Sequence, residues 1–150
     1  MSKPIIRPAR PADTATIVRF NIALADESEG LRLDPKTVEA GVRRMFSDPA
    51  LGRYFLAVSS TGERLGQVMI TTEWSDWRNC MIWWLQSVYT APEQRGRGVF
   101  RSLCEHVLGE AGDAGCRVRL YVERANNRAI AAYRALGFDH CGYHVMEHRA

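Results

Sequence analysis

The sequence contains no long apolar run, no signal-like leader and too few residues for a second domain. No stretch approaches the ~18 consecutive apolar residues that a membrane-spanning helix needs. The first residues, Met1-Ser2-Lys3-Pro4, lead straight into a strand pattern without the apolar core of a secretory signal. At 150 residues the chain has the length of one domain, 1–150. We therefore expect a single-domain cytoplasmic protein that does not enter a membrane.

Patterns typical of metal or nucleic-acid binding are also missing. The cysteines are Cys80, Cys104, Cys116 and Cys141. They show no Cys-x-x-Cys spacing, and we expect reduced, mostly packed thiols. The His and Cys side chains of 140–148 would need a helix to converge, whereas alternation of Tyr143, Val145 and Glu147 predicts a strand. The net charge is only +3, and no basic run interleaves with aromatics. We expect no metal ion and no nucleic-acid partner.

The chain does contain a glycine-rich turn between a strand pattern and a helix pattern. Residues 83–90 are mainly apolar, Gly96 and Gly98 follow, and an apolar-periodic helix begins next. Glycine permits backbone conformations that other residues avoid and lets a ligand approach the main chain. The first amides of a helix attract anions. The spacing is neither that of a P-loop nor the three-glycine dinucleotide fingerprint. By itself this segment indicates either an ordinary turn or a polyphosphate site.

A second segment, 126–138, narrows this choice. It has the form of a short helix with Asn126 as its N-cap, an apolar face and a glycine stop. It also matches the whole pattern Asn-x-x-Ala-x-x-x-Tyr-x-x-x-Gly-Phe. The upstream turn fits Arg/Gln-x-x-Gly-x-Gly/Ala at Arg95 and Gly98 and departs from it at Phe100. With both motifs present, the chain resembles the GNAT superfamily of acyl-CoA N-acyltransferases over almost its whole length.

The order of elements is compatible with the fold of that superfamily. We expect strands near 4–8, 54–59, 65–73, 81–90, 118–122 and 142–148, and helices beginning near 11, 35, 98 and 126. The resulting order, βααβββαβαβ, predicts an α/β fold. It is a GNAT-like mixed, mostly antiparallel central sheet with helices on both faces.

The resemblance implies acetyl-CoA as co-substrate. Its pantetheine arm would pair with the free edge of the strand before the turn, and its phosphates would bind the loop amides and nearby arginines. The residues expected to bind it are Val88, Tyr89, Thr90, Arg95, Gly96, Arg97, Gly98, Val99, Phe100, Arg101, Asn126, Ala129 and Tyr133. The Val88 amide would polarise the thioester carbonyl. Tyr133 would protonate the departing sulfur, although a core aromatic on an amphipathic helix would have the same spacing.

On the acceptor side, the resemblance is to the polyamine acetyltransferase branch, but one carboxylate is missing. Gln86 stands where that branch has a carboxylate on the central strand, and an amide cannot take up the amine proton at neutral pH. Glu27 and Glu29 lie where the family places its acceptor loop, and they could attract a cationic amine or form a solvated helix end. Candidate acceptor-binding residues are Glu27, Glu29, Gln86 and Trp74. The general base is another residue, with Glu73, Asp76 and Tyr143 in reserve, or water, or it is absent.

Four tryptophans lie within 74–84. Alternating burial in a strand explains Trp83 and Trp84, whereas Trp74 and Trp77 flank a predicted turn. An acceptor-site wall or a homodimer contact would account for that pair. The expected function is acetyl transfer from acetyl-CoA to a primary amine of a small molecule such as a polyamine or an amino acid. Acetylation of a protein N-terminus or lysine, and a non-catalytic CoA-binding sensor, are the alternatives.

Overall fold

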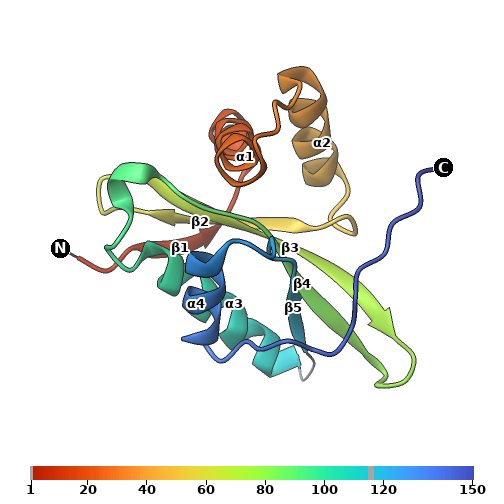
Figure 1. Cartoon of the computed structure of the whole chain (residues 1–150). Coiled ribbons are helices and arrows are strands. Elements are labelled where there is room, and N and C mark those ends of the chain that lie inside the picture. Colours follow the sequence, from red (N-terminus) through yellow and green to blue (C-terminus); the bar gives the residue numbers. More distant parts are fainter. Residues whose placement is uncertain (1, 115–116) are drawn as a thin grey trace.

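The computed structural model describes residues 2–114 and 117–150, which form a five-stranded sheet with helices on both faces (Figure 1). The strands are β1 (Ile5–Pro8), β2 (Arg53–Val58), β3 (Arg64–Ser75), β4 (Cys80–Thr90) and β5 (Val118–Leu120). Their spatial order is β1-β2-β3-β4-β5. The first four are antiparallel, and β5 runs parallel to β4. The predicted mixed, mostly antiparallel sheet is confirmed.

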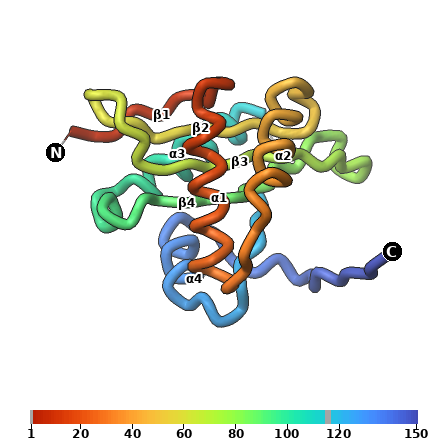
Figure 2. Tube along the Cα trace, turned by 90° about the horizontal axis from the view of Figure 1, so that it is seen from above, coloured from red at the N-terminus to blue at the C-terminus, as the bar shows by residue number. Residues whose placement is uncertain are grey.

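Two helices cover each face of the sheet. The long helices are α1 (Thr14–Glu29), α2 (Pro35–Ser47), α3 (Val99–Ala114) and α4 (Asn127–Arg134). Figures 1 and 2 show α1 and α2 together on one face, with α1 crossing the strands, and α3 and α4 on the other. Local signals explain the helix ends. Asp34 accepts a hydrogen bond from the Thr37 amide at 3.0 Å, and Gly30 closes α1 with φ 62°.

The alternation of side chains along the strands divides the core into two layers. Phe55, Val68 and Leu85 are buried against α3, in a cluster that includes Leu103 and Val107 of that helix. The opposite face packs Tyr54, Leu56 and Val58 against α1 and α2. Successive residues of a strand point to opposite faces, so one strand supplies both layers. The floor of the candidate site belongs to the α1 and α2 face.

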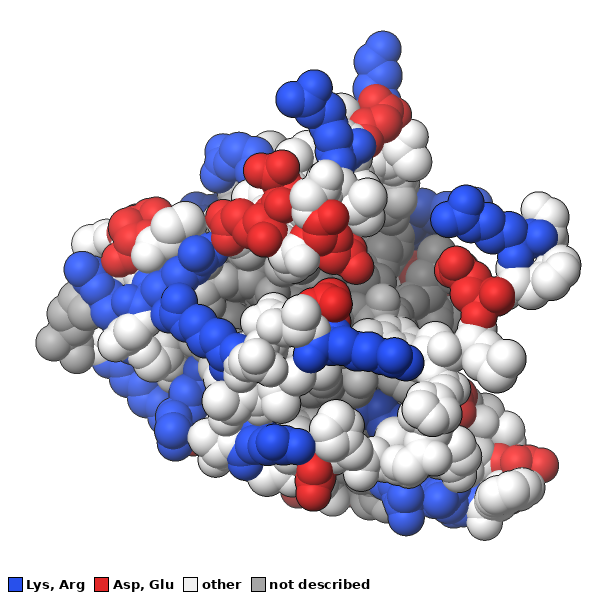
Figure 3. Space-filling model, in the orientation of Figure 1, with Lys and Arg blue, Asp and Glu red and all other residues white. Residues whose placement is uncertain are grey.

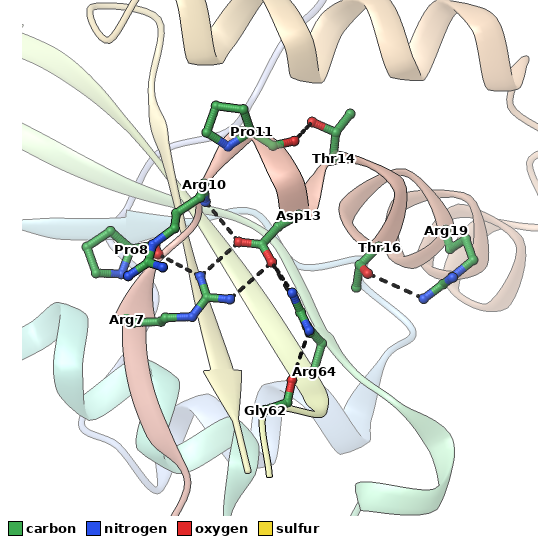
Figure 4. A network of polar contacts seen from close by, with 10 residues as sticks. All are labelled: Arg7, Pro8, Arg10, Pro11, Asp13, Thr14, Thr16, Arg19, Gly62 and Arg64. Atoms are coloured by element: carbon green, nitrogen blue, oxygen red, sulfur yellow. Dashed lines mark hydrogen bonds and ion pairs between the residues drawn. The ribbon is translucent and has the colours of Figure 1, made fainter. Parts of the chain in front are cut away.

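A buried carboxylate ties β1, α1 and β3 together (Figure 4). The side chain of Asp13 is 1% exposed and accepts two hydrogen bonds from Arg7, at 2.8 and 3.0 Å, and two from Arg64, at 3.0 and 3.1 Å. The Arg10 amide adds a fifth at 2.9 Å. These bonds, those from Arg7 first, hold the pKa of the Asp13 carboxyl well below its usual range. The network fixes the start of α1 relative to the sheet.

Two sequence-based expectations are wrong. The predicted strand at 142–148 is not formed, and residues 139–150 run as an exposed, extended segment that leaves the body of the molecule (Figures 1 and 2). An alternating pattern forms a strand only where its backbone pairs with a neighbouring strand, and no described strand pairs with these residues. Cys80 is disulfide-bonded rather than reduced. Cys104 and Cys141 are free thiols, as expected, and Cys116 lies outside the described residues.

Two further findings concern membrane-spanning helices and metal sites. Within 2–114 and 117–150, no helix is both long and apolar enough to cross a membrane. No group of three or more His, Cys, Asp or Glu side chains in those same ranges could hold a metal ion.

Candidate active site

The glycine-rich turn joins the end of β4 to the N-terminus of α3 through the short helix η2 (Pro92–Gln94). Gly96 and Gly98 have φ of 75° and 80°, a region that favours glycine. A Cβ atom built on either glycine would meet nothing within 4 Å, so the space above the turn is open. Glycine is therefore favoured at both positions by the backbone conformation, and not because a side chain would collide with neighbouring atoms.

The turn presents the first amides of α3. The Ser102 amide donates to the Gly98 carbonyl at 2.9 Å, and this is the first bond of the helical ladder. The amides of Val99, Phe100 and Arg101 precede it and have no carbonyl one turn back within the helix. The side chain of Val99 is buried and that of Arg101 is exposed. Main-chain donors beside an open surface, with the positive end of the helix dipole behind them, suit a phosphate.

Arg95 fixes this turn to two other elements. Its guanidinium donates to the Thr90 carbonyl at 3.1 Å and to Glu27 of α1 at 2.5 Å, and it lies 5.6 Å from the Tyr89 ring centre. The Tyr89 hydroxyl donates to the other Glu27 oxygen at 3.0 Å. The sequence predicts Glu27 on the acceptor side and Arg95 on the cofactor side. The structure places them in direct contact, because α1 ends against the turn.

The sign of charge changes across this boundary. Acidic side chains gather over the end of α1 that faces the viewer in Figure 3, and basic side chains lie next to them on the side of the β4–α3 turn. The last residues of α1 include Asp26, Glu27 and Glu29, and the turn carries Arg95 and Arg97. The pKa of the Tyr89 phenol is raised, mainly by burial and then by the neighbouring Glu27 carboxylate. The Tyr89 hydroxyl therefore stays protonated and can donate its hydrogen bond.

Strand β4 contains a bulge immediately before the turn. Gln67 of β3 lies opposite Tyr89, but Met69 lies opposite Gln86, so β4 has one more residue than β3 in this interval. The extra residue falls at Ser87–Val88, and Ser87 has φ 50°, which is unusual for a residue with a side chain. A bulge of this kind redirects the backbone groups that follow it. Here those groups belong to Val88, whose amide is the oxyanion donor that the family resemblance predicts.

A buried polar bridge supports the bulge. The Gln67 side chain is fully buried, and its amide donates to the Ser87 carbonyl at 3.2 Å and to the Asn21 side chain at 2.8 Å. Asn21 in turn donates to the Tyr54 hydroxyl at 2.9 Å. The support that Gln67 and Asn21 give to the bulge is not predicted from the sequence. An Asn and a Gln within otherwise apolar patterns could have indicated it, because a buried polar side chain needs hydrogen-bond partners.

Beyond Leu85, no described strand lies on the β5 side of β4. Pairing between β4 and β5 covers Trp83, Trp84 and Leu85 of β4 and ends there. Residues 86–90 therefore have backbone groups on that side that no described strand pairs. Gly66 of β3 approaches the same region on the other side, where a Cβ would lie 2.6 Å from the Tyr89 carbonyl oxygen. An extended ligand could add to the open side of β4 as a strand would.

Tyr133 of α4 lies next to the first turn of α3. Its ring centre is 5.2 Å from that of Phe100, nearly perpendicular to it, and 5.6 Å from that of Phe138. Phe100, the residue that departs from the motif, therefore packs its ring against that of Tyr133, the motif tyrosine. Tyr133 also packs against the α3 side of the core. Burial raises the pKa of its phenol, which is consequently protonated at neutral pH.

Asn126 is the N-cap of α4, as the sequence predicts. Its side-chain oxygen accepts a hydrogen bond from the Ala129 amide at 3.1 Å. Both residues are half-buried. The cap fixes the start of the helix that carries Tyr133, whatever further contact Asn126 makes with a ligand.

The uncovered part of the α1 and α2 face forms the candidate acceptor side. The Gln86 side chain donates to the Thr71 hydroxyl at 2.6 Å. Next to this pair on the same face of the sheet, the Glu73 carboxylate accepts a hydrogen bond from the Trp84 indole at 3.0 Å. It also lies 3.9 Å from the Arg119 guanidinium. The Glu73 side chain remains 49% exposed, so its charge is available to a ligand.

Aromatic rings surround this carboxylate. Tyr121 stacks on Trp84 with ring centres 4.6 Å apart, and Arg119 lies 5.5 Å from the ring centre of Tyr143. A shallow pocket extends from Glu73 towards the hairpin turn, with Trp74 and Trp77 among its lining residues. These two tryptophans are 55% and 84% exposed, the exposure expected of a contact surface. Glu29 is also exposed, at the end of α1.

Comparison with known proteins agrees with this geometry. Residues 20–138 match the acetyltransferase (GNAT) family. An aminoglycoside N(6')-acetyltransferase type 1 of Stenotrophomonas maltophilia is 31% identical over 142 residues, covering 92% of this chain and 88% of that protein. A thialysine N-epsilon-acetyltransferase of Bos taurus is 32% identical over 146 residues, covering 91% and 85%.

A solved structure gives the same result in three dimensions. A possible acetyltransferase from Clostridium difficile 630 superposes with a TM-score of 0.92, at 36% identity and with 99% of both chains covered. The chain belongs to the acetyltransferase (GNAT) family. It is an N-acetyltransferase.

Proposed function

We propose that this enzyme transfers an acetyl group from acetyl-CoA to a primary amine of a small cationic molecule, such as a polyamine or a basic amino acid. One observation carries the proposal most directly. An open glycine turn at a helix N-terminus directly follows a bulged strand whose outer edge is unpaired. This combination would provide an anion site and an extended-chain site next to each other.

The described residues fit acetyl-CoA. The amides of Val99 to Arg101 would hold the pyrophosphate, with Arg97 at its side. The free edge of β4 at Val88 to Thr90 would bind the pantetheine arm, and Asn126 and Ala129 lie at the start of the helix that faces it. When bound, acetyl-CoA supplies an activated acyl group as a thioester.

Two groups of the protein would then act on the reacting atoms. The Val88 amide, redirected by the bulge, would donate to the carbonyl oxygen as negative charge develops there. The bridge from Gln67 to Ser87 would hold that amide in place, because it fixes the bulged backbone. Tyr133, with its phenol protonated, would give a proton to the departing sulfur.

The acceptor would approach from the α1 and α2 face. Glu73 is a half-exposed carboxylate beside stacked aromatic rings, a setting that attracts a cationic amine by charge and by ring contact. Gln86 is bonded to Thr71 and would position the amine rather than take its proton. The proton would leave to water or to a carboxylate of this face, such as Glu73.

The test is thiol release from acetyl-CoA in the presence of polyamines, basic amino acids and aminoglycosides. We expect release with at least one cationic amine and none with its fully acetylated form. Absence of release with every amine, while calorimetry shows acetyl-CoA bound, would refute the proposed acceptor class. Absence of acetyl-CoA binding at millimolar ligand would refute the proposed donor.

Tyr133→Phe separates the catalytic from the packing role of Tyr133. The variant keeps the ring contacts with Phe100 and removes only the hydroxyl. We expect unchanged acetyl-CoA affinity and a turnover lower by roughly 100-fold, as for the loss of one proton donor. The control is Phe138→Leu, which alters packing around the same ring but removes no proton donor. Wild-type turnover in Tyr133→Phe would assign Tyr133 to the core alone.

A further inference from the structure

The shallow pocket beside Glu73, called the Glu73 pocket below, has a balanced charge. The charged residues described in its lining are two carboxylates, Glu73 and Asp76, and two guanidinium groups, Arg78 and Arg119. Figures 1 and 2 show the β3–β4 hairpin, which carries three of these residues, extending past α1 and α2. The pocket volume is about 260 Å³, below the usual range for a drug-sized ligand. The pocket therefore suits one end of a small ligand, and the charges of its lining decide which end.

Arg119 makes this pocket different from a simple cation site. Its side chain is only 16% exposed and lies between two rings, 6.0 Å from the Trp84 ring centre and 5.5 Å from that of Tyr143. Its ion pair with Glu73 has an N–O distance of 3.9 Å, which is too long for a hydrogen bond. A guanidinium has several N–H donors and no acceptor. Since no described residue accepts a hydrogen bond from this one, Arg119 keeps donors for the carboxylate of a ligand.

The positive charge of Arg119 also disfavours a bare diamine at Glu73. An ammonium group that binds the Glu73 carboxylate would lie a few ångströms from the guanidinium, and like charges at that separation repel. A zwitterion avoids the conflict, because its ammonium can meet Glu73 while its carboxylate meets Arg119. Opening the Glu73–Arg119 contact costs little, since the contact is long and Glu73 is half-exposed. The charges of the pocket thus match the α-amino and α-carboxylate groups of an amino acid.

The distance from the pocket to the reacting atoms sets the length of this amino acid. Trp84 lies opposite Arg119 in the β4–β5 ladder and donates to Glu73. Along an extended strand, Gln86 and Val88 would follow Trp84 by about 7 and 13 Å, and the bulge shortens the second interval. An amine acetylated beside the Val88 amide must therefore be separated from the head group by a long stem. The four-carbon stem of a lysine side chain spans more of this interval than shorter homologues do.

We propose that the acceptor is a diamino acid of the lysine type, which binds Glu73 through its α-amino group and Arg119 through its α-carboxylate and is acetylated on its side-chain amine. The inference rests on the proposed function and selects one class among its acceptors. The side-chain nitrogen forms a bond to the acetyl carbon as the carbon–sulfur bond breaks. That nitrogen loses a proton to water or a carboxylate, and the CoA sulfur gains one from Tyr133. Arg119 is the residue that distinguishes the amino acid from a diamine of equal length.

Matched acceptors test recognition of the head group. Cadaverine is lysine without the α-carboxylate, and lysinamide is lysine with that carboxylate replaced by a neutral amide. We expect kcat/KM for lysine to exceed that for either analogue by roughly tenfold or more, as for one charge-assisted pair. Ornithine, with a shorter stem, should be acetylated more slowly than lysine. Mass spectrometry of the lysine product should place the acetyl group on the side-chain nitrogen.

Arg119→Gln should remove the preference for lysine. We expect the Michaelis constant for lysine to rise roughly tenfold, whereas kcat/KM for cadaverine stays the same or increases because a repulsive charge is gone. The matched control is Arg53→Gln. Arg53 also lies over a β4 tryptophan, 4.9 Å from the Trp83 ring centre, and pairs with Glu110, but it is on the opposite face of the sheet. This control should keep the wild-type ratio of lysine to cadaverine, and circular dichroism establishes that both variants retain the fold.

The outcomes separate this inference from the proposed function. Three results would overturn the diamino-acid proposal and leave acetyl transfer to a small amine intact. They are equal kcat/KM for lysine and cadaverine or release with polyamines or aminoglycosides alone, acetylation of lysine on its α-nitrogen, and a wild-type ratio of lysine to cadaverine in Arg119→Gln. Absence of thiol release with every amine would instead overturn the proposed function, and this inference with it.

Discussion

Two carboxylates of this enzyme bind arginine and have opposite surroundings. Asp13 is buried and accepts five hydrogen bonds, from two guanidinium groups and one amide. Glu27 is 41% exposed and accepts one bond from Arg95 and one from Tyr89. A buried charge cannot exchange its partners without a large penalty, whereas an exposed pair exchanges them with water or a ligand at little cost. The contacts of Asp13 with Arg7 and Arg64 therefore stabilise the fold, whereas the contact of Glu27 with Arg95 can change when a ligand binds.

The largest expected effect is on stability, from Asp13→Asn. Loss of the charge leaves two arginines around a buried neutral group, and we expect about 3 kcal/mol lower free energy of unfolding. This is at the low end for breaking a buried pair, because Arg7 and Arg64 keep 23% and 39% exposure. The matched change at the other carboxylate, Glu27→Gln, should cost under about 1 kcal/mol. Urea unfolding of both variants measures the difference, and equal losses would contradict the comparison.

The buried Asp13 carboxylate also predicts that the free energy of unfolding depends on pH. The folded-state pKa of Asp13 is depressed, mainly by the hydrogen bonds from Arg7, so its contribution is present above the unfolded pKa of about 4. It is lost progressively as the pH falls below about 4 towards the depressed value. Unfolding free energies measured at pH 7, 4 and 3 should fall more for the wild type than for Asp13→Asn, with most of the difference arising between pH 4 and pH 3. Parallel curves would show that other carboxylates control the acid limb.

A smaller effect distinguishes the two arginines of the turn. Arg95 holds the turn to the Thr90 carbonyl, whereas Arg97 has a contact of 3.5 Å to Gln94 within the turn. Arg95→Ala should weaken CoA binding by roughly tenfold at low salt and keep part of that loss at high salt, because packing is not screened. The loss in Arg97→Ala should largely disappear at high salt. Calorimetry at two ionic strengths measures both, and identical salt responses would contradict the distinction.

The smallest effect concerns the acidic end of α1. Glu29→Gln should raise the Michaelis constant of a cationic acceptor several-fold and leave acetyl-CoA affinity unchanged, as expected for loss of an exposed charge. Glu27→Gln should alter both constants, because Glu27 also restrains Arg95. Steady-state kinetics in both substrates tests this. Wild-type constants in both variants would move acceptor recognition to Glu73 and its aromatic neighbours.

Much of this site was predictable from local patterns. Gly96 and Gly98 indicated a turn with left-handed backbone, and Asn126 indicated a helix cap; the structure has both. The contact between Glu27 and Arg95 was not predictable, because the two residues are 68 positions apart and their side chains meet only through packing of α1 on β4. The bulge at Ser87 was missed for a related reason, since it depends on the partner strand and on Gln67 beneath it.

The sequence by itself determined the family, the order of nearly all elements and the two motifs, because these depend on residue periodicity, caps and short spacings. Tertiary structure decided which charges are buried, where β4 bulges and which backbone edges stay open, because these depend on neighbours distant in the chain. Residues 142–148 show the division clearly. Their alternation is typical of a strand, but whether a strand forms depends on hydrogen bonding to a neighbouring strand, and no described strand pairs with these residues.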